Sequence, residues 1–131
     1  MNNTKIISAL LYLGVVFYLI GGVVHVFGIT LFPWFVSQLY SPYHDTLIAI
    51  SSVAMAIIFW QGAHHPENKE LLDAIMWVAF VCSPLIIVMG LFVNFGRYGA
   101  TAEIKSFEAI LEGLVGIILG AALFWLRRKK I

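Results

Sequence analysis

The residues best suited to chemistry are two carboxylates near the C-terminus, Glu108 and Glu112. They stand four positions apart, so on a helix they lie on one face, one turn above the other. The run from Ala109 to Leu126 is apolar except for Glu112. A carboxylate exposed at the centre of a membrane costs about 2.5–3.5 kcal/mol on insertion scales, and less near an interface. We therefore expect Glu112 to face other helices, either paired or protonated.

His25 is the next residue of interest, because it continues a helical stripe of small and polar residues that includes Gly14, Tyr18 and Gly21. The stripe predicts that His25 faces other helices and not lipid. Glu112 and His25 are the candidate catalytic residues, since a carboxyl group and an imidazole can act as general acid and base.

A wider set of polar groups gathers on one side of the predicted membrane. When the apolar runs are aligned across a bilayer, the inner half carries few polar groups. This one-sided distribution predicts a ligand pocket that opens outward, because a through-going pore needs polar groups along its whole length. Five candidate ligand-binding residues lie in the outer third or at its edge: His25, Asn94, Arg97, Glu108 and Glu112. Two more, His44 and Asp45, lie in the adjoining loop.

These groups must be positioned by apolar helices. The chain has 131 residues, of which 61% are hydrophobic and 11% charged, a balance far from that of a soluble domain. About 20 apolar residues cross ~30 Å of hydrocarbon as a helix. We predict an all-α integral membrane protein, a single four-transmembrane-helix up-down bundle over 1–131. Its spans are expected at about 6–28, 46–63, 71–95 and 107–126.

Three local patterns refine this bundle. A short interfacial helix is predicted at about 32–41, between spans one and two, because its apolar residues follow helical spacing and Pro33 suits a first turn. Pro84 predicts a kink that interrupts span three. Gly116 and Gly120 continue the face of the two carboxylates, and such glycines favour close packing against another helix.

The distribution of cations predicts the orientation. An arrangement with both termini inside places Lys5, Lys69 and the four cations of 127–130 in the cytoplasm, and only Arg97 and Lys105 outside. Six cations against two satisfy the positive-inside tendency. We expect a multi-pass protein of the cell membrane with both termini cytoplasmic, and a bacterial inner membrane as its location.

Three functions are compatible with this pattern. The pocket could bind or transport an amphipathic small molecule or lipid, since such pockets are mostly apolar with a few placed polar groups. Alternatively, the protein is an accessory or scaffold subunit in which Arg97 with Glu108, or His25 with Glu112, form structural charge pairs. A third alternative is a small membrane enzyme that uses Glu112 and His25 as acid and base.

Partners and cofactors are constrained by what the sequence lacks. No HxxxH, HExxH or ExxH spacing predicts a metal site, and the single Cys82 excludes an internal disulfide and multi-cysteine metal motifs. No cofactor is predicted, since no second histidine within a span could join His25 on a haem. The absence of a basic patch beyond the C-terminal cations argues against nucleic acid. The expected partners are the lipid bilayer, a lipid or amphipathic ligand, and another membrane protein or a second copy of the chain.

Overall fold

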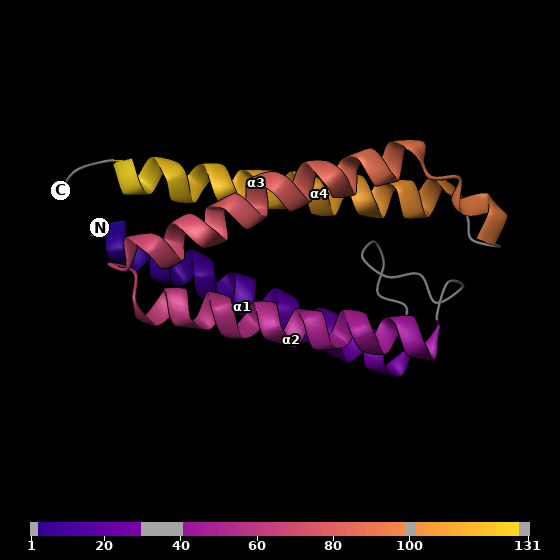
Figure 1. The fold of residues 1–131 in the computed structure, drawn as a ribbon, viewed down its shortest axis with the longest axis horizontal. Helices are drawn as coiled ribbons and strands as arrows, with labels where there is room; N and C mark the ends of the chain where they lie inside the picture. Colours follow the sequence, from indigo (N-terminus) through magenta and orange to yellow (C-terminus); the bar gives the residue numbers. More distant parts are fainter. Residues whose placement is uncertain (1–2, 30–40, 99–101, 129–131) are drawn as a thin grey trace.

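Four long helices make up most of the chain (Figure 1). The computed structural model describes residues 3–29, 41–98 and 102–128, and within these ranges it contains no strand. All four long helices are sufficiently long and apolar to cross a bilayer. The prediction of an all-α protein with four such helices is therefore confirmed. The elements are α1 (Asn3–Phe27), α2 (Pro42–His64), α3 (Lys69–Phe92), the short 3-10 helix η2 (Phe95–Tyr98) and α4 (Ala102–Arg128).

The helix ends follow local signals and differ by a few residues from the expected spans. α1 ends at Gly28, which has a positive φ of 61°, a conformation that glycine adopts without steric cost. α2 begins at Pro42 and not near Thr46, because proline is well suited to the first helical position. Asp45 therefore lies inside the first turn of α2. α4 begins at Ala102, ahead of the expected 107.

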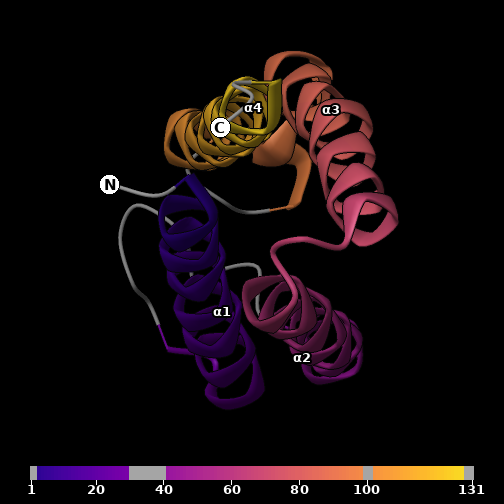
Figure 2. The same cartoon turned by 90° about the vertical axis from the view of Figure 1, so that its left-hand side faces the viewer.

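The helices pack as two antiparallel hairpins, α1 with α2 and α3 with α4 (Figures 1 and 2). Glycines allow the close approach within each hairpin. Gly14 lies against the ring of Phe59 in the first hairpin. In the second, a Cβ atom added at Gly113 would lie 2.7 Å from the carbonyl oxygen of Ser83, and one added at Gly116 would meet the Ser83 side chain. The glycine face predicted for the last helix thus packs against α3, as expected of small residues between membrane helices.

Pro84 lies next to this contact, inside α3. The helix continues across it from Lys69 to Phe92. Residues 82–84 therefore do not break the helix, although proline removes one backbone donor, and the kink expected at Pro84 stays a prediction. Neighbouring helices allow a membrane helix to tolerate that loss.

The two hairpins meet at the end of the molecule that holds both chain termini, which we call the closed end (Figure 1). Leu11, Ile75 and Leu123 are fully buried there, from α1, α3 and α4. The Asn3 side-chain amide also donates to the carbonyl oxygen of Leu126 at 3.1 Å, linking α1 to α4. The apolar core of this end comprises Ile7, Leu11, Phe59, Ala63, Leu72, Ile75, Met76, Leu123 and Leu126.

Toward the opposite end, which we call the open end, the hairpins separate (Figure 1). Contacts between the hairpins are few compared with those inside each hairpin. The open end is formed by the last turns of α1 and α3 and the first turns of α2 and α4. The bundle is therefore shaped like a clamp whose two arms are hairpins.

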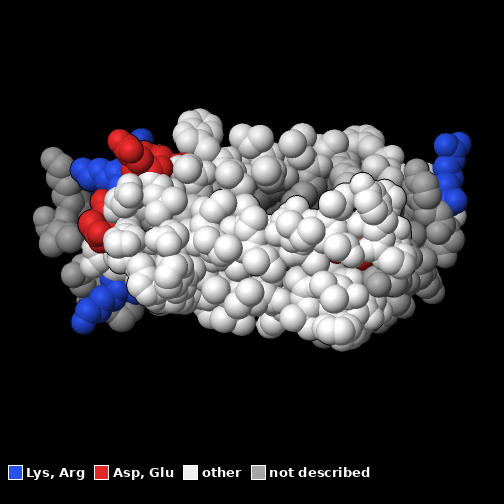
Figure 3. All heavy atoms as spheres, turned by 60° about the horizontal axis from the view of Figure 1, so that its bottom comes forward, with Lys and Arg blue, Asp and Glu red and all other residues white. Residues whose placement is uncertain are grey.

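The outer surface of the clamp is apolar along its length. On the face shown in Figure 3, charged side chains gather at the two ends, and one small acidic patch is recessed toward the open end. Large side chains such as Leu13, Trp77 and Ile118 are exposed on the helices. These features are compatible with a multi-pass membrane protein. The short helix expected at about 32–41 falls on residues 30–40, outside the described ranges, and so stays a prediction.

Candidate functional site

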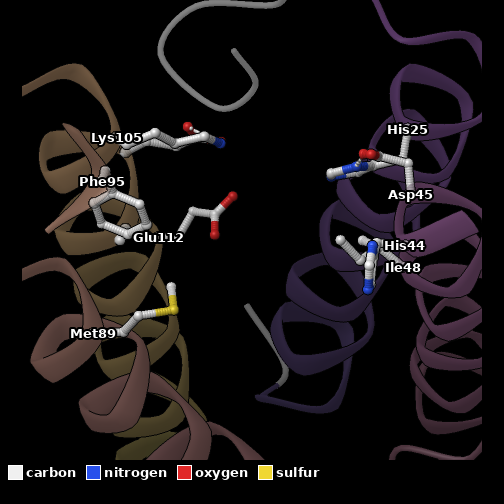
Figure 4. A pocket seen from close by; sticks show the side chains of 10 residues that line it. His25, His44, Asp45, Ile48, Met89, Phe95, Lys105 and Glu112 are labelled. Atoms are coloured by element: carbon white, nitrogen blue, oxygen red, sulfur yellow. Dashed lines mark hydrogen bonds and ion pairs between the residues drawn. The ribbon is translucent and has the colours of Figure 1, made fainter. Parts of the chain in front are cut away.

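A cavity of about 310 Å³ lies between the hairpins at the open end (Figure 4). This volume is at the lower end of the range of about 300–1,000 Å³ that is typical of small-molecule sites. Both arms of the clamp contribute to its lining. The first hairpin supplies His25, His44, Asp45 and Ile48, and the second supplies Met89, Phe95, Lys105, Glu108, Ala109 and Glu112.

The wall from the first hairpin is organised by Asp45, which is only 4% exposed. Its Oδ1 atom lies 2.5 Å from Nδ1 of His25, and its Oδ2 atom accepts the backbone N–H of Ser41 at 2.6 Å. Both carboxylate oxygens are thus engaged. With Asp45 ionised, Nδ1 of His25 must carry the proton of this contact, because a carboxylate only accepts. Tight packing of α1 on α2 brings these two residues together, although they are 20 positions apart.

His44 is the more exposed histidine of this wall. Its Nδ1 atom lies 3.0 Å from the hydroxyl oxygen of Ser41, and its ring makes an edge contact with Tyr43. Ser41 therefore connects His44 to Asp45 at the first turn of α2.

The wall from the second hairpin carries a buried ion pair. The Lys105 ammonium lies 2.6 Å from Oε2 of Glu108, and their side chains are 16% and 7% exposed. The two residues are three positions apart on α4, a spacing at which helical side chains meet. Each wall of the cavity thus contains a close pair of ionisable groups, and each pair is formed within one hairpin.

Glu112 differs from these paired groups. It lies one turn along α4 from Glu108, and its carboxylate points into the cavity toward the wall of His25 and Asp45 (Figure 4). Among the described residues, no hydrogen bond or ion pair involves this carboxylate. Met89 and Phe95 lie on the same wall and supply apolar surface beside it.

The structure brings together most of the residues that the sequence singled out. Asn94 and Arg97 are exposed, lie just beyond the end of α3, and do not line the cavity. Of the pairs considered from the sequence, Glu108 contacts Lys105 and not Arg97, and His25 contacts Asp45 and not Glu112. The predicted residues that do line the cavity are His25, His44, Asp45, Glu108 and Glu112.

Lys105 is the main charged residue of the site that the sequence reasoning did not select. Its spacing of three from Glu108 was the signal that could have found it. Met89, Phe95 and Ile48 gave no such signal, since they are apolar residues in or beside apolar helices.

The available chemistry is that of charge and hydrogen bonding. In the parts of the chain that the structure describes, no three His, Cys, Asp or Glu side chains are grouped to hold a metal ion. His25 and Glu112 lie on opposite walls, so a ligand between them would contact an imidazole on one side and a carboxylate on the other.

No protein family, no curated protein and no solved structure is detectably similar to the chain. Its function must therefore be argued from the geometry of this cavity.

Proposed function

We propose that the protein spans the cell membrane and that its cavity binds or transports an amphipathic small molecule or lipid. One observation carries this proposal: ionisable and apolar side chains line the same cavity between two hairpins. Glu112 and His25 offer polar contacts, while Ile48, Met89 and Phe95 offer apolar surface. A molecule with a polar head and an apolar body matches such a lining.

The proposed orientation follows the cations. Lys5, Lys69, Arg127 and Arg128 belong to the helix ends at the closed end, whereas Arg97 and Lys105 belong to the open end. The positive-inside tendency then directs the closed end and both termini to the cytoplasm and the cavity outward. A bacterial inner membrane and an interfacial helix at about 32–41 are parts of this proposal.

The arrangement of charge pairs favours a ligand site over a purely structural role. A structural pair that fixed the two arms would join one hairpin to the other. Among the described residues, His25–Asp45 lies within the first hairpin and Lys105–Glu108 within α4, and no ion pair joins the hairpins. The open end is thus held apart, with one carboxylate facing the space. A scaffold role or a membrane enzyme remains an alternative proposal, and the latter requires a substrate that contacts both His25 and Glu112.

The test is to fill the cavity. Ile48 lines it, whereas Ile50, two positions along α2, is 61% exposed on the outer surface. We expect amphiphiles from a membrane lipid extract to raise the melting temperature of the wild-type protein in a neutral detergent. Ile48→Trp should abolish this rise because the indole occupies the cavity, and Ile50→Trp should keep it.

Two results would contradict the proposal. One is a wild-type protein whose melting temperature no extract fraction raises. The other is an Ile48→Trp variant that responds as fully as Ile50→Trp.

A further inference from the structure

We propose that the cavity selects a positively charged amphiphile, whose cationic head pairs with Glu112 while its chain lies against the apolar part of the lining. This inference rests on the proposed binding function and names the chemical class of the ligand. It follows from the charges of the cavity lining and from Glu112, the one carboxylate of that lining that has no partner among the described residues.

The charges of the lining do not cancel. Asp45, Glu108 and Glu112 are three carboxylates, and they share the cavity with one lysine and two histidines. With its carboxylates ionised, the lining is therefore net negative unless both histidines are protonated. Lys105 neutralises Glu108 at 2.6 Å and Nδ1 of His25 contacts Asp45 at 2.5 Å, so Glu112 is the carboxylate of the lining that has no partner among the described residues.

The position of Glu112 makes this charge available to a ligand. Its carboxylate points across the cavity, one helical turn beyond the Lys105–Glu108 pair (Figure 4). A carboxylate withdrawn from water and left unpaired is costly, and an opposite charge within contact distance offsets that cost. A cationic head bound there would supply the missing partner. Phe95 lies on the same wall, and an aromatic ring also attracts a cation placed over its face.

Other head groups are matched less well. An anionic head would be repelled by Glu112 and would find Lys105 already in contact with Glu108. A zwitterionic phosphocholine head could place its ammonium on Glu112, but its phosphate would then compete with Glu108 for Lys105. Arg97 offers no alternative, because it lies outside the cavity lining.

The size of the site limits the part of the ligand that it holds. A cavity of about 310 Å³ is small for an entire lipid, so it suits a compact head and the first part of a chain. Ile48 and Met89, from opposite hairpins, supply the apolar contacts. We infer that the rest of the chain leaves the site between the two hairpins, where contacts between helices are few.

The test compares four probes with the same ten-carbon chain: decyltrimethylammonium, decylphosphocholine, decanoate and decanol. Each is titrated below its micelle concentration into the full-length protein in a maltoside detergent, with affinity measured by calorimetry. We expect the cation to bind the wild type most tightly. Glu112→Gln, which preserves shape but not charge, should weaken the cation roughly tenfold or more and change decanol by less than about twofold, where tenfold corresponds to about 1.4 kcal/mol.

The matched control is Glu67→Gln, since the Glu67 side chain is 70% exposed at the closed end. This variant should bind the cation as the wild type does. If Glu112→Gln does not fold, the ranking of the four probes on the wild type decides the question alone, because only a cation-selective site prefers the ammonium probe over decanol.

The outcomes separate this inference from the proposed function. One outcome is that Ile48→Trp removes binding, but the wild type prefers decanol, decanoate or decylphosphocholine to the cation. This result would show that the ligand is not cationic, while the proposed pocket would stand. If Glu67→Gln and Glu112→Gln lose cation binding equally, the inference that the ligand is cationic is also overturned. If none of the four probes binds the wild type, both the class and the pocket are overturned.

Discussion

At the closed end, the two hairpins bury leucine, isoleucine and phenylalanine side chains against each other, whereas at the open end they face each other across carboxylates, histidines and a lysine. The contrast occurs along single helices: α1 supplies Leu11 to the core and His25 to the cavity. The apolar core and the cavity proposed to bind a ligand thus occupy different halves of the same helices. A packed half can hold the fold while the other half keeps a cavity and a carboxylate without a partner among the described residues, which by themselves would destabilise it.

The largest loss of stability is expected from a substitution in the core of the closed end. Leu11 is 0% exposed, whereas Leu13, two positions along α1, is 67% exposed on the outer surface. Leu11→Ala should lower the free energy of unfolding by about 2–5 kcal/mol, because it leaves a cavity in the only core that joins the described parts of both hairpins. Denaturant unfolding in detergent, followed by tryptophan fluorescence, measures the change.

Leu13→Ala is the control and should change the stability little. Equal losses for the two variants would show that the closed end does not hold the hairpins together.

A smaller effect is expected inside the hairpins. A Cβ atom at Gly113 would lie 2.7 Å from the Ser83 carbonyl oxygen, whereas one at Gly21 would meet its nearest neighbour, the hydroxyl oxygen of Ser52, at 3.8 Å. Gly113→Ala should therefore cost about 1–3 kcal/mol of stability by overpacking the contact of α3 with α4.

Gly21→Ala serves as the comparison and should be neutral or stabilising by up to about 1 kcal/mol, because alanine favours the helix. Thermal melts of the two variants in the same detergent distinguish these expectations. A Gly113→Ala protein that melts like Gly21→Ala would contradict the tight packing of α3 on α4.

The smallest effect is expected at the one ion pair between α3 and α4 at the closed end. Arg127 pairs with Asp73, and their side chains are 27% and 42% exposed. Solvent screens a pair of this kind, so Asp73→Asn should change the stability by only about 0–1 kcal/mol. A loss as large as that of Leu11→Ala, in the same unfolding assay, would mean that charge and not apolar packing secures this end.

The sequence predicted the elements better than their arrangement. Apolar runs of sufficient length determine where helices can form, and the spacing of Glu108 and Glu112 correctly placed both on one face of α4 toward the cavity. The charge pairs that the sequence offered as one alternative, Arg97 with Glu108 and His25 with Glu112, differ from the pairs in the structure. Helical spacing identifies which residues share a face, but not how far apart the facing helices stand.

This difference has a physical origin in the shape of the clamp. An evenly packed bundle could bring His25 close to Glu112, as one alternative from the sequence supposed. In the structure, α1 packs tightly on α2 but separates from α4 at the open end, so His25 meets Asp45 instead. This separation depends on how one hairpin packs on the other, which the spacing of residues along a single helix does not describe.

In the described part of the chain, the core that joins the two hairpins lies at one end, so each hairpin can act as a lever. With a rise of about 1.5 Å per residue, the axis of α1 runs roughly 21 Å from Leu11 to His25. If the core around Leu11 acts as the pivot, a rotation of about 10° there displaces the far end of this ~21 Å arm by about 4 Å, more than the diameter of a water molecule. Repacking of the core around Leu11 would then change the width of the cavity, although no core side chain lines it.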